Sequence, residues 1–217
     1  MKKFLLSLSL AIAINMVNYS QDLKEILQNT LTMLDSAKSV QDMFNAANRL
    51  ELIAGKWDTT WITHYYCTYS FGLVSYYEKD VDKRDGYLDK ADKHLERTKA
   101  LVKTSNDELF VLAAFIANAR LSVKPESRWK KYGDIFNAEI DSAKAIRPEN
   151  PRIYFLEANS VYYRPKMFGG GEKNALPYYQ KAEELYNNET ENDIFKPSWG
   201  KNENSKLLEK CKNADKE

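Results

Sequence analysis

From about residue 21 onward, apolar residues recur every three or four positions, which is the spacing of one face of an α-helix. The stretch 108–123 is apolar on most of its faces, which is typical of a helix packed on two sides. No strand-like alternation of useful length interrupts this pattern. The 217 residues include only eight glycines and six prolines, which disfavours a turn-rich all-β chain. We therefore predict an all-α fold with no β-sheet.

Cap and stop residues divide the chain into successive helices. Gly55 ends the second helix, Asp58 or Thr59 caps the third, and Asn106 or Asp107 caps the fifth. Pro151 begins the seventh at the first helical position, where its missing N–H costs nothing. The predicted helices cover about residues 21–34, 40–54, 58–77, 85–103, 108–123, 126–146, 151–162, 172–186 and 199–212.

Six of these helices form three successive helix–turn–helix units, over 58–104, 107–147 and 151–187. The second helix of each unit repeats a pattern of a small or apolar residue, a bulky one four positions later and a small one three after that. The three sets are Ala91, Leu95 and Thr98; Phe136, Ile140 and Ala143; and Ala175, Tyr179 and Ala182. A repeated helical hairpin cannot bury its own faces alone, so we expect the units to stack into an α-α superhelix.

The N-terminus has the pattern of a secretory signal. Two lysines precede the mostly apolar run 4–17, which is too short to cross a bilayer. We predict a signal peptide over 1–20, a helical pair over 21–56, three hairpins over 57–187, and a loop with a C-terminal capping helix over 188–217. No later segment is apolar enough to span a membrane. We therefore expect an exported protein, periplasmic or secreted, with no membrane insertion after cleavage.

Charge and composition exclude several classes of function. The chain has 32 Lys and Arg against 31 Asp and Glu, so it offers no field to attract nucleic acid. Two His and two Cys are too few for a zinc cluster, and no cofactor motif is present, so we expect neither a metal nor a cofactor. Cys67 and Cys211 form a disulfide only if the last helix folds back onto the third; otherwise they are two buried thiols.

Aromatic residues give the most distinctive candidate site. Trp57, Trp61 and Tyr65 are four residues apart and lie beside the core stripe of the third helix. One interpretation is an exposed platform on which a peptide or a sugar ring stacks. The other is that the three residues pack in the core, and this is favoured because aromatic stripes at helical spacing are usually buried. Tyr162 and Tyr163 raise the same question, with the same answer.

Two smaller features have structural interpretations. The segment 168–171 lacks the Lys-Ser/Thr of a phosphate-binding loop, so its glycines let the chain double back, with Gly170 at positive φ and Phe168 filling the hairpin. His64 caps a polar pocket among tyrosines, and a role as general base has no nucleophile within reach in the sequence.

The repeat pattern resembles the tetratricopeptide (TPR) repeat. The resemblance rests on the Ala-x3-Tyr-x2-Ala pattern beginning at Ala175 and on Ile-Arg-Pro-Glu-Asn-Pro at 146–151. The chain departs from that repeat in two ways. The distance between successive units exceeds the usual repeat length of about 34 residues, and Phe136 stands where the repeat normally has Ala. With Trp61 and the Pro-Ser-Trp-Gly at 197–200, the order of motifs over about 40–212 looks like a group of exported TPR-like proteins of Gram-negative bacteria with no assigned activity.

The resemblance implies a fold and a binding groove, with no catalytic residues. Asn118, Arg152 and Asn159 stand where TPR domains place residues that clamp a peptide carboxylate, although the set is incomplete. We therefore predict a non-enzymatic interaction scaffold in the bacterial cell envelope that binds a protein or peptide. The alternatives are a carbohydrate-binding accessory protein that uses Trp57, Trp61 and Tyr65, or an enzyme whose residues meet only in the fold.

Overall fold

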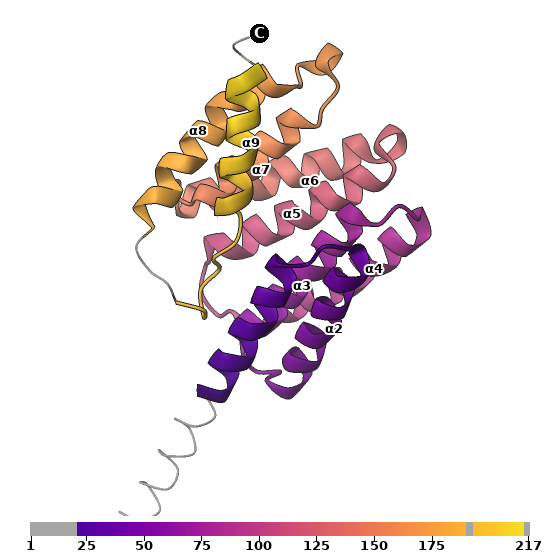
Figure 1. Ribbon diagram of the computed structural model, residues 1–217, viewed down its shortest axis with the longest axis vertical. Coiled ribbons are helices and arrows are strands. Elements are labelled where there is room, and N and C mark those ends of the chain that lie inside the picture. The colour runs from indigo at the N-terminus through magenta and orange to yellow at the C-terminus, as the bar shows by residue number, and fades with distance from the viewer. Residues whose placement is uncertain (1–20, 190–192, 215–217) are drawn as a thin grey trace, which may run out of the picture.

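The computed structural model describes residues 21–189 and 193–214, and every regular element within these ranges is a helix. Neighbouring helices pack as antiparallel hairpins that stack into a superhelix (Figure 1), which confirms the predicted all-α fold. The signal peptide predicted for residues 1–20 lies outside the described residues.

The helices follow one another with short connections. The elements are a helix over residues 21–35, α2 (Val40–Lys56), α3 (Trp61–Tyr77), α4 (Val81–Leu101), α5 (Asp107–Val123), α6 (Pro125–Ile146), α7 (Pro151–Tyr162), the 3-10 turn η1 (Lys166–Phe168), α8 (Glu172–Asn188) and α9 (Lys201–Ala214). All the helices expected from the periodicity are present, with ends that differ by a few residues.

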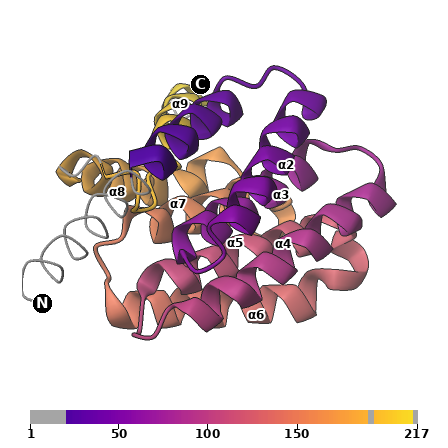
Figure 2. The same ribbon diagram turned by 90° about the horizontal axis from the view of Figure 1, so that it is seen from below.

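The hairpins place α3, α5 and α7 side by side in an inner row. α3 packs on α4, α5 on α6 and α7 on α8, while α5 touches both α3 and α7. Figure 2 shows α4 and α6 on one side of this row, with helix 21–35 and α9 together on the opposite side. We call the side of α3, α5 and α7 that is turned toward helix 21–35 and α9 the inner face.

Side-chain caps fix four of the helix starts, those of α2, α4, α5 and α7. Asn106 accepts a hydrogen bond from the backbone N–H of Glu108 at 2.9 Å, and Pro151 is the first residue of α7. The start of α3 differs from the prediction, because Asp58 does not cap the helix. Its carboxylate binds Arg97 instead, and α3 begins only at Trp61.

The repeated pattern forms the packing core of each hairpin. All nine of its positions, on α4, α6 and α8, are buried. Cys67 and Cys211 are buried as well and both are free thiols, so the bridge considered from the sequence is not formed.

Among the described residues, none of the helices combines the length and the apolar character needed to cross a membrane.

Candidate functional site

The three aromatic residues considered as a platform pack into or against the core, which is the interpretation that the sequence favoured. Trp57 is only 2 % exposed and Tyr65 is fully buried, while Trp61 is half-buried with its ring edge-on to Tyr65. The Tyr65 hydroxyl donates to Glu108 Oε2 at 2.9 Å and accepts from the Trp199 indole at 2.8 Å. A ligand therefore has no open ring face of Trp57 or Tyr65 to stack on, and these residues pack the core.

The predicted carboxylate clamp is not assembled either. Arg152 is 1 % exposed, and the amide oxygen of Asn159 accepts a hydrogen bond from the Tyr179 hydroxyl at 2.7 Å. Asn118 is half-buried on α5. The structure thus assigns Arg152 and Asn159 to internal contacts, which leaves no set of three side chains to hold a peptide carboxylate.

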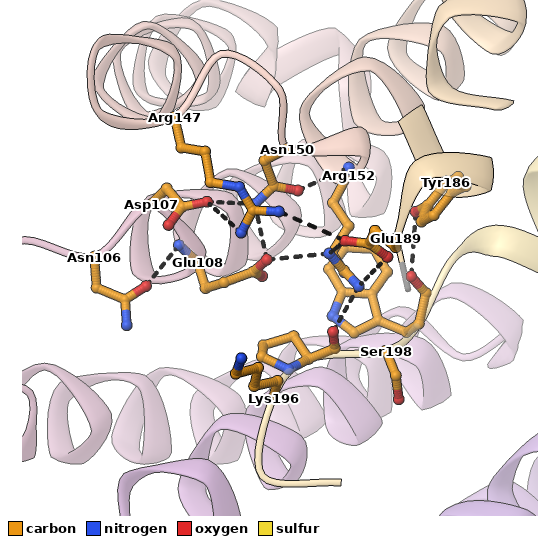
Figure 3. Close-up of polar contacts among 12 residues, drawn as sticks. Asn106, Asp107, Glu108, Arg147, Asn150, Arg152, Tyr186, Glu189, Lys196 and Ser198 are labelled. Atoms are coloured by element: carbon orange, nitrogen blue, oxygen red, sulfur yellow. Dashed lines mark hydrogen bonds and ion pairs between the residues drawn. The ribbon is translucent and has the colours of Figure 1, made fainter. Parts of the chain in front are cut away.

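Arg152 is instead the centre of a buried polar network (Figure 3). Its Nη1 donates to Glu108 Oε1 at 3.1 Å and to Glu189 Oε1 at 3.0 Å, and its Nη2 donates to the Pro197 carbonyl at 2.6 Å. Asn150 Nδ2 donates to the same Glu108 oxygen at 2.8 Å. The network therefore ties α5 and α7 to the end of α8 and to the segment before α9.

The charges of this network depend on one another. Burial raises the pKa of Glu108, and Arg152 together with the Tyr65 hydroxyl opposes that rise. Burial alone would lower the pKa of Arg152, but Glu108 and its other neighbours raise it above its ordinary value, so Arg152 stays charged. Both terminal nitrogens of Arg152 are engaged by protein groups. We therefore interpret the network as a structural clamp.

The clamp holds Trp199 against the inner face. The Trp199 ring stacks on Tyr69 of α3, with centroids 4.7 Å apart and planes at 22°. The same ring contacts Phe115 of α5 at 5.7 Å and Phe155 of α7 at 6.2 Å. Trp199 is 7 % exposed, so its ring is buried between this segment and the inner face.

Two exposed tyrosines lie at the C-terminal ends of α3 and α7. Tyr77, the last residue of α3, is 51 % exposed, and Tyr163, the residue after α7, is 73 % exposed. Burial contributes most to raising the pKa of each phenol, and the charge of Glu203 on α9 adds to both shifts. Lys206 acts on Tyr77 in the opposite direction. We call Tyr77, Tyr163, Glu203 and Lys206 the tyrosine rim.

A shallow depression adjoins the tyrosine rim along α9. Its volume is about 290 Å³, and it shares Glu203 and Lys206 with the rim. The residues that line it are Glu203, Lys206, Leu207, Glu209, Lys210 and Asn213. Exposed phenol rings beside lysine ammonium groups can hold a small ligand that has an apolar face and anionic groups.

The sequence did not indicate this rim. Its aromatic pattern favoured a buried Tyr163 and did not single out Tyr77. A usable signal was present, because a Tyr-Tyr pair ends the first helix of two hairpins, Tyr76–Tyr77 and Tyr162–Tyr163. In each pair the second tyrosine is the more exposed one.

The two histidines meet in the core, which the sequence did not indicate. His64 Nδ1 on α3 lies 2.9 Å from His94 Nδ1 on α4, and both rings are buried. Asp58 lies 3.3 Å from His64 Nε2, and Glu51 lies 3.7 Å from His94 Nε2. Within residues 21–189 and 193–214, no group of three or more His, Cys, Asp or Glu side chains could hold a metal ion.

Comparison with known proteins shows a similarity to a solved structure. No protein-family model matches the chain, and no curated protein matches it. Among solved structures, the chain is similar to the HusA haemophore from Porphyromonas gingivalis, with 29 % sequence identity and a TM-score of 0.73. The match covers 88 % of this chain and 92 % of the haemophore, so it extends over nearly the whole superhelix.

Proposed function

We propose that this protein is an exported, TPR-like binding protein of the bacterial envelope that takes up a flat, apolar ligand of the porphyrin class at the tyrosine rim. The observation that carries the proposal is the exposure of Tyr77 and Tyr163 beside the α9 depression. The similarity to a haemophore supports the choice of ligand class. The role is binding and carrying, without catalysis.

The chemistry of the rim suits such a ligand. Exposed phenol rings give an apolar face on which a planar macrocycle can stack. Lys206 and Lys210 line the adjoining depression and can pair with the carboxylates of a porphyrin. Burial raises the pKa of Tyr163, so the free protein presents a neutral phenol ring there at neutral pH. If stacking on the two rings carries the affinity, iron-free porphyrin should bind about as tightly as haemin.

An absorbance titration tests this proposal. Purified protein is titrated with haemin and with protoporphyrin IX, alongside the double variant Tyr77→Ala/Tyr163→Ala. We expect the double variant to bind both ligands at least about tenfold more weakly, since two stacking contacts are lost. Trp129→Ala is the matched control, because Trp129 is 64 % exposed on the outer helix α6. Wild-type affinity in the double variant, or no porphyrin binding by the native protein, would overturn the proposal.

A protein or peptide partner is the second candidate, and the superhelix of stacked hairpins favours it. In this case the tyrosine rim would contact a segment of another envelope protein. Cross-linking in cells with the native protein and with Tyr77→Ala/Tyr163→Ala tests it. A discrete partner that is lost only in the variant would support the scaffold role, while retention of that partner would place the contact elsewhere.

A further inference from the structure

The segment between α7 and α8 presents two large apolar side chains to solvent. Met167 is 82 % exposed and Phe168 is 65 % exposed, so Phe168 does not fill the hairpin as the sequence suggested. Figure 1 shows this segment projecting at one end of the molecule. We call residues 164–171 the α7–α8 loop. Both side chains lie at its 3-10 turn η1.

The backbone of this loop makes its own hydrogen bonds. The N–H groups of Phe168 and Gly170 donate to the Pro165 carbonyl at 2.9 and 3.3 Å, and the N–H of Gly171 donates to Val161 at 3.1 Å. Asn174 Nδ2 donates to the carbonyls of Gly169 and Gly170. These backbone groups would therefore keep their hydrogen-bond partners if the loop moved out of water. An apolar environment requires this, because it offers no water to replace a lost partner.

Glycines fix the direction of the loop. Gly169 and Gly171 have φ values of 77° and 101°, which residues other than glycine rarely adopt. Gly170 has no such φ, but a Cβ there would overlap the Arg164 carbonyl. The chain is thus held in a tight turn that keeps Met167 and Phe168 pointing outward.

Basic residues surround the two apolar side chains. Arg164, Lys166 and Lys173 are all exposed, and the Lys166 side chain is 83 % exposed. Glu172 is the one acidic residue between positions 164 and 173, and it lies 3.7 Å from Lys166 Nζ. The loop therefore combines an apolar apex with an excess of positive charge. Long basic side chains can keep their charged ends in a polar layer while a neighbouring apolar side chain enters the apolar layer beneath it.

We propose that the α7–α8 loop docks on an anionic lipid surface, with Met167 and Phe168 entering the headgroup region and Arg164, Lys166 and Lys173 contacting the negative headgroups. A lipid surface fits better than a protein groove, because the apex projects from the fold, is positively charged and makes several of its backbone hydrogen bonds within the loop. Binding of this kind depends on buried apolar area together with charge attraction. The proposal is independent of porphyrin binding, since neither Met167 nor Phe168 belongs to the tyrosine rim.

Vesicle co-sedimentation tests the docking. The probe is the chain from Gln21 onward, which contains every element of the described fold, mixed with phosphatidylcholine vesicles with and without phosphatidylglycerol. We expect binding to the anionic vesicles that weakens as salt is added, and at least about tenfold weaker binding for Met167→Ser/Phe168→Ser. Lys166→Glu should weaken binding to the anionic vesicles only.

Two controls keep the result interpretable. Leu52→Ser removes an equally exposed apolar side chain from α2, where Leu52 is 76 % exposed, and should bind vesicles as the native chain does. Haemin titration without lipid should give the same affinity for Met167→Ser/Phe168→Ser as for the native chain. No binding to anionic vesicles, or equal binding by the native chain and this double variant, would overturn the proposal whatever the porphyrin titration shows.

Discussion

At the scale of single residues, the contact between His64 and His94 makes the protein sensitive to acid. Their Nδ1 atoms are 2.9 Å apart, so one must donate a proton and the other must accept it. Burial lowers the pKa of both, and the charge of His64 lowers that of His94 further. Asp58 and Glu51 oppose these shifts, while Arg97 and Lys93 add to them. The folded state therefore favours neutral rings.

We expect the free energy of unfolding to fall as the pH drops below about 6.5, the ordinary histidine pKa. Below that value the unfolded chain binds more protons than the folded chain, so stability is lost as the pH falls toward the folded-state pKa. Urea unfolding between about pH 5 and about pH 8 measures this dependence. The double variant His64→Gln/His94→Gln contains no histidine, because the chain has only two. An equally steep loss in that variant between about pH 7 and about pH 6 would contradict the assignment.

Residue identity alone did not locate the candidate site. No local feature of the sequence distinguishes Trp57 and Tyr65 from Tyr77 and Tyr163, since all four are aromatic residues in or next to an expected helix. Their burial differs because of what covers them. The Tyr65 hydroxyl meets Trp199, a residue 134 positions away, while the ends of α3 and α7 have no such cover over Tyr77 and Tyr163. Such a long-range contact leaves no local pattern in the sequence.

At the scale of elements, the helices follow from local signals and their exact starts from tertiary contacts. Periodicity, Asn106 and Pro151 predicted the helices and two of their starts correctly. α4 begins at Val81, earlier than expected, because the Asp80 carboxylate caps it through the N–H of Lys83 at 2.9 Å. Asp58 does not cap α3, since Arg97 from α4 binds its carboxylate. The sequence spacing cannot reveal that competition.

The α7–α8 loop gives a prediction at this scale. Gly170→Ala should lower the free energy of unfolding by about 1–3 kcal/mol, because the new Cβ would overlap the Arg164 carbonyl. Gly55→Ala is the matched control in helix α2, where a Cβ meets no atom within 4 Å, and it should raise stability by about 0.5–1 kcal/mol. Both changes are measured by urea denaturation. A neutral Gly170→Ala would mean that the loop relaxes freely.

At the scale of the whole molecule, the segment before α9 closes the superhelix on itself. In many solenoids each repeat contacts only its neighbours. Here the Tyr66 hydroxyl on α3 donates to the Lys196 carbonyl at 2.8 Å, and Trp199 contacts α3, α5 and α7 together. The stack should therefore unfold in one cooperative transition.

Trp199→Ala tests this closure. We expect a loss of about 3–5 kcal/mol in the free energy of unfolding, since a buried aromatic ring is removed from three helices at once. Trp129→Ala, on the exposed side of α6, should change stability by no more than about 0.5 kcal/mol. Equal effects of the two substitutions in urea denaturation would show that Trp199 does not join the hairpins energetically.

The position of Trp199 also has a consequence for synthesis. Because a chain is made from its N-terminus, α3 emerges long before the residues that cover Tyr65, Tyr66 and Tyr69 exist. Until about residue 199 has been added, these three tyrosines lack part of their final cover. They then stay exposed to water, contact another chain or are bound by a chaperone. Chains truncated ahead of Trp199 should therefore aggregate during translation, while the finished chain stays dispersed.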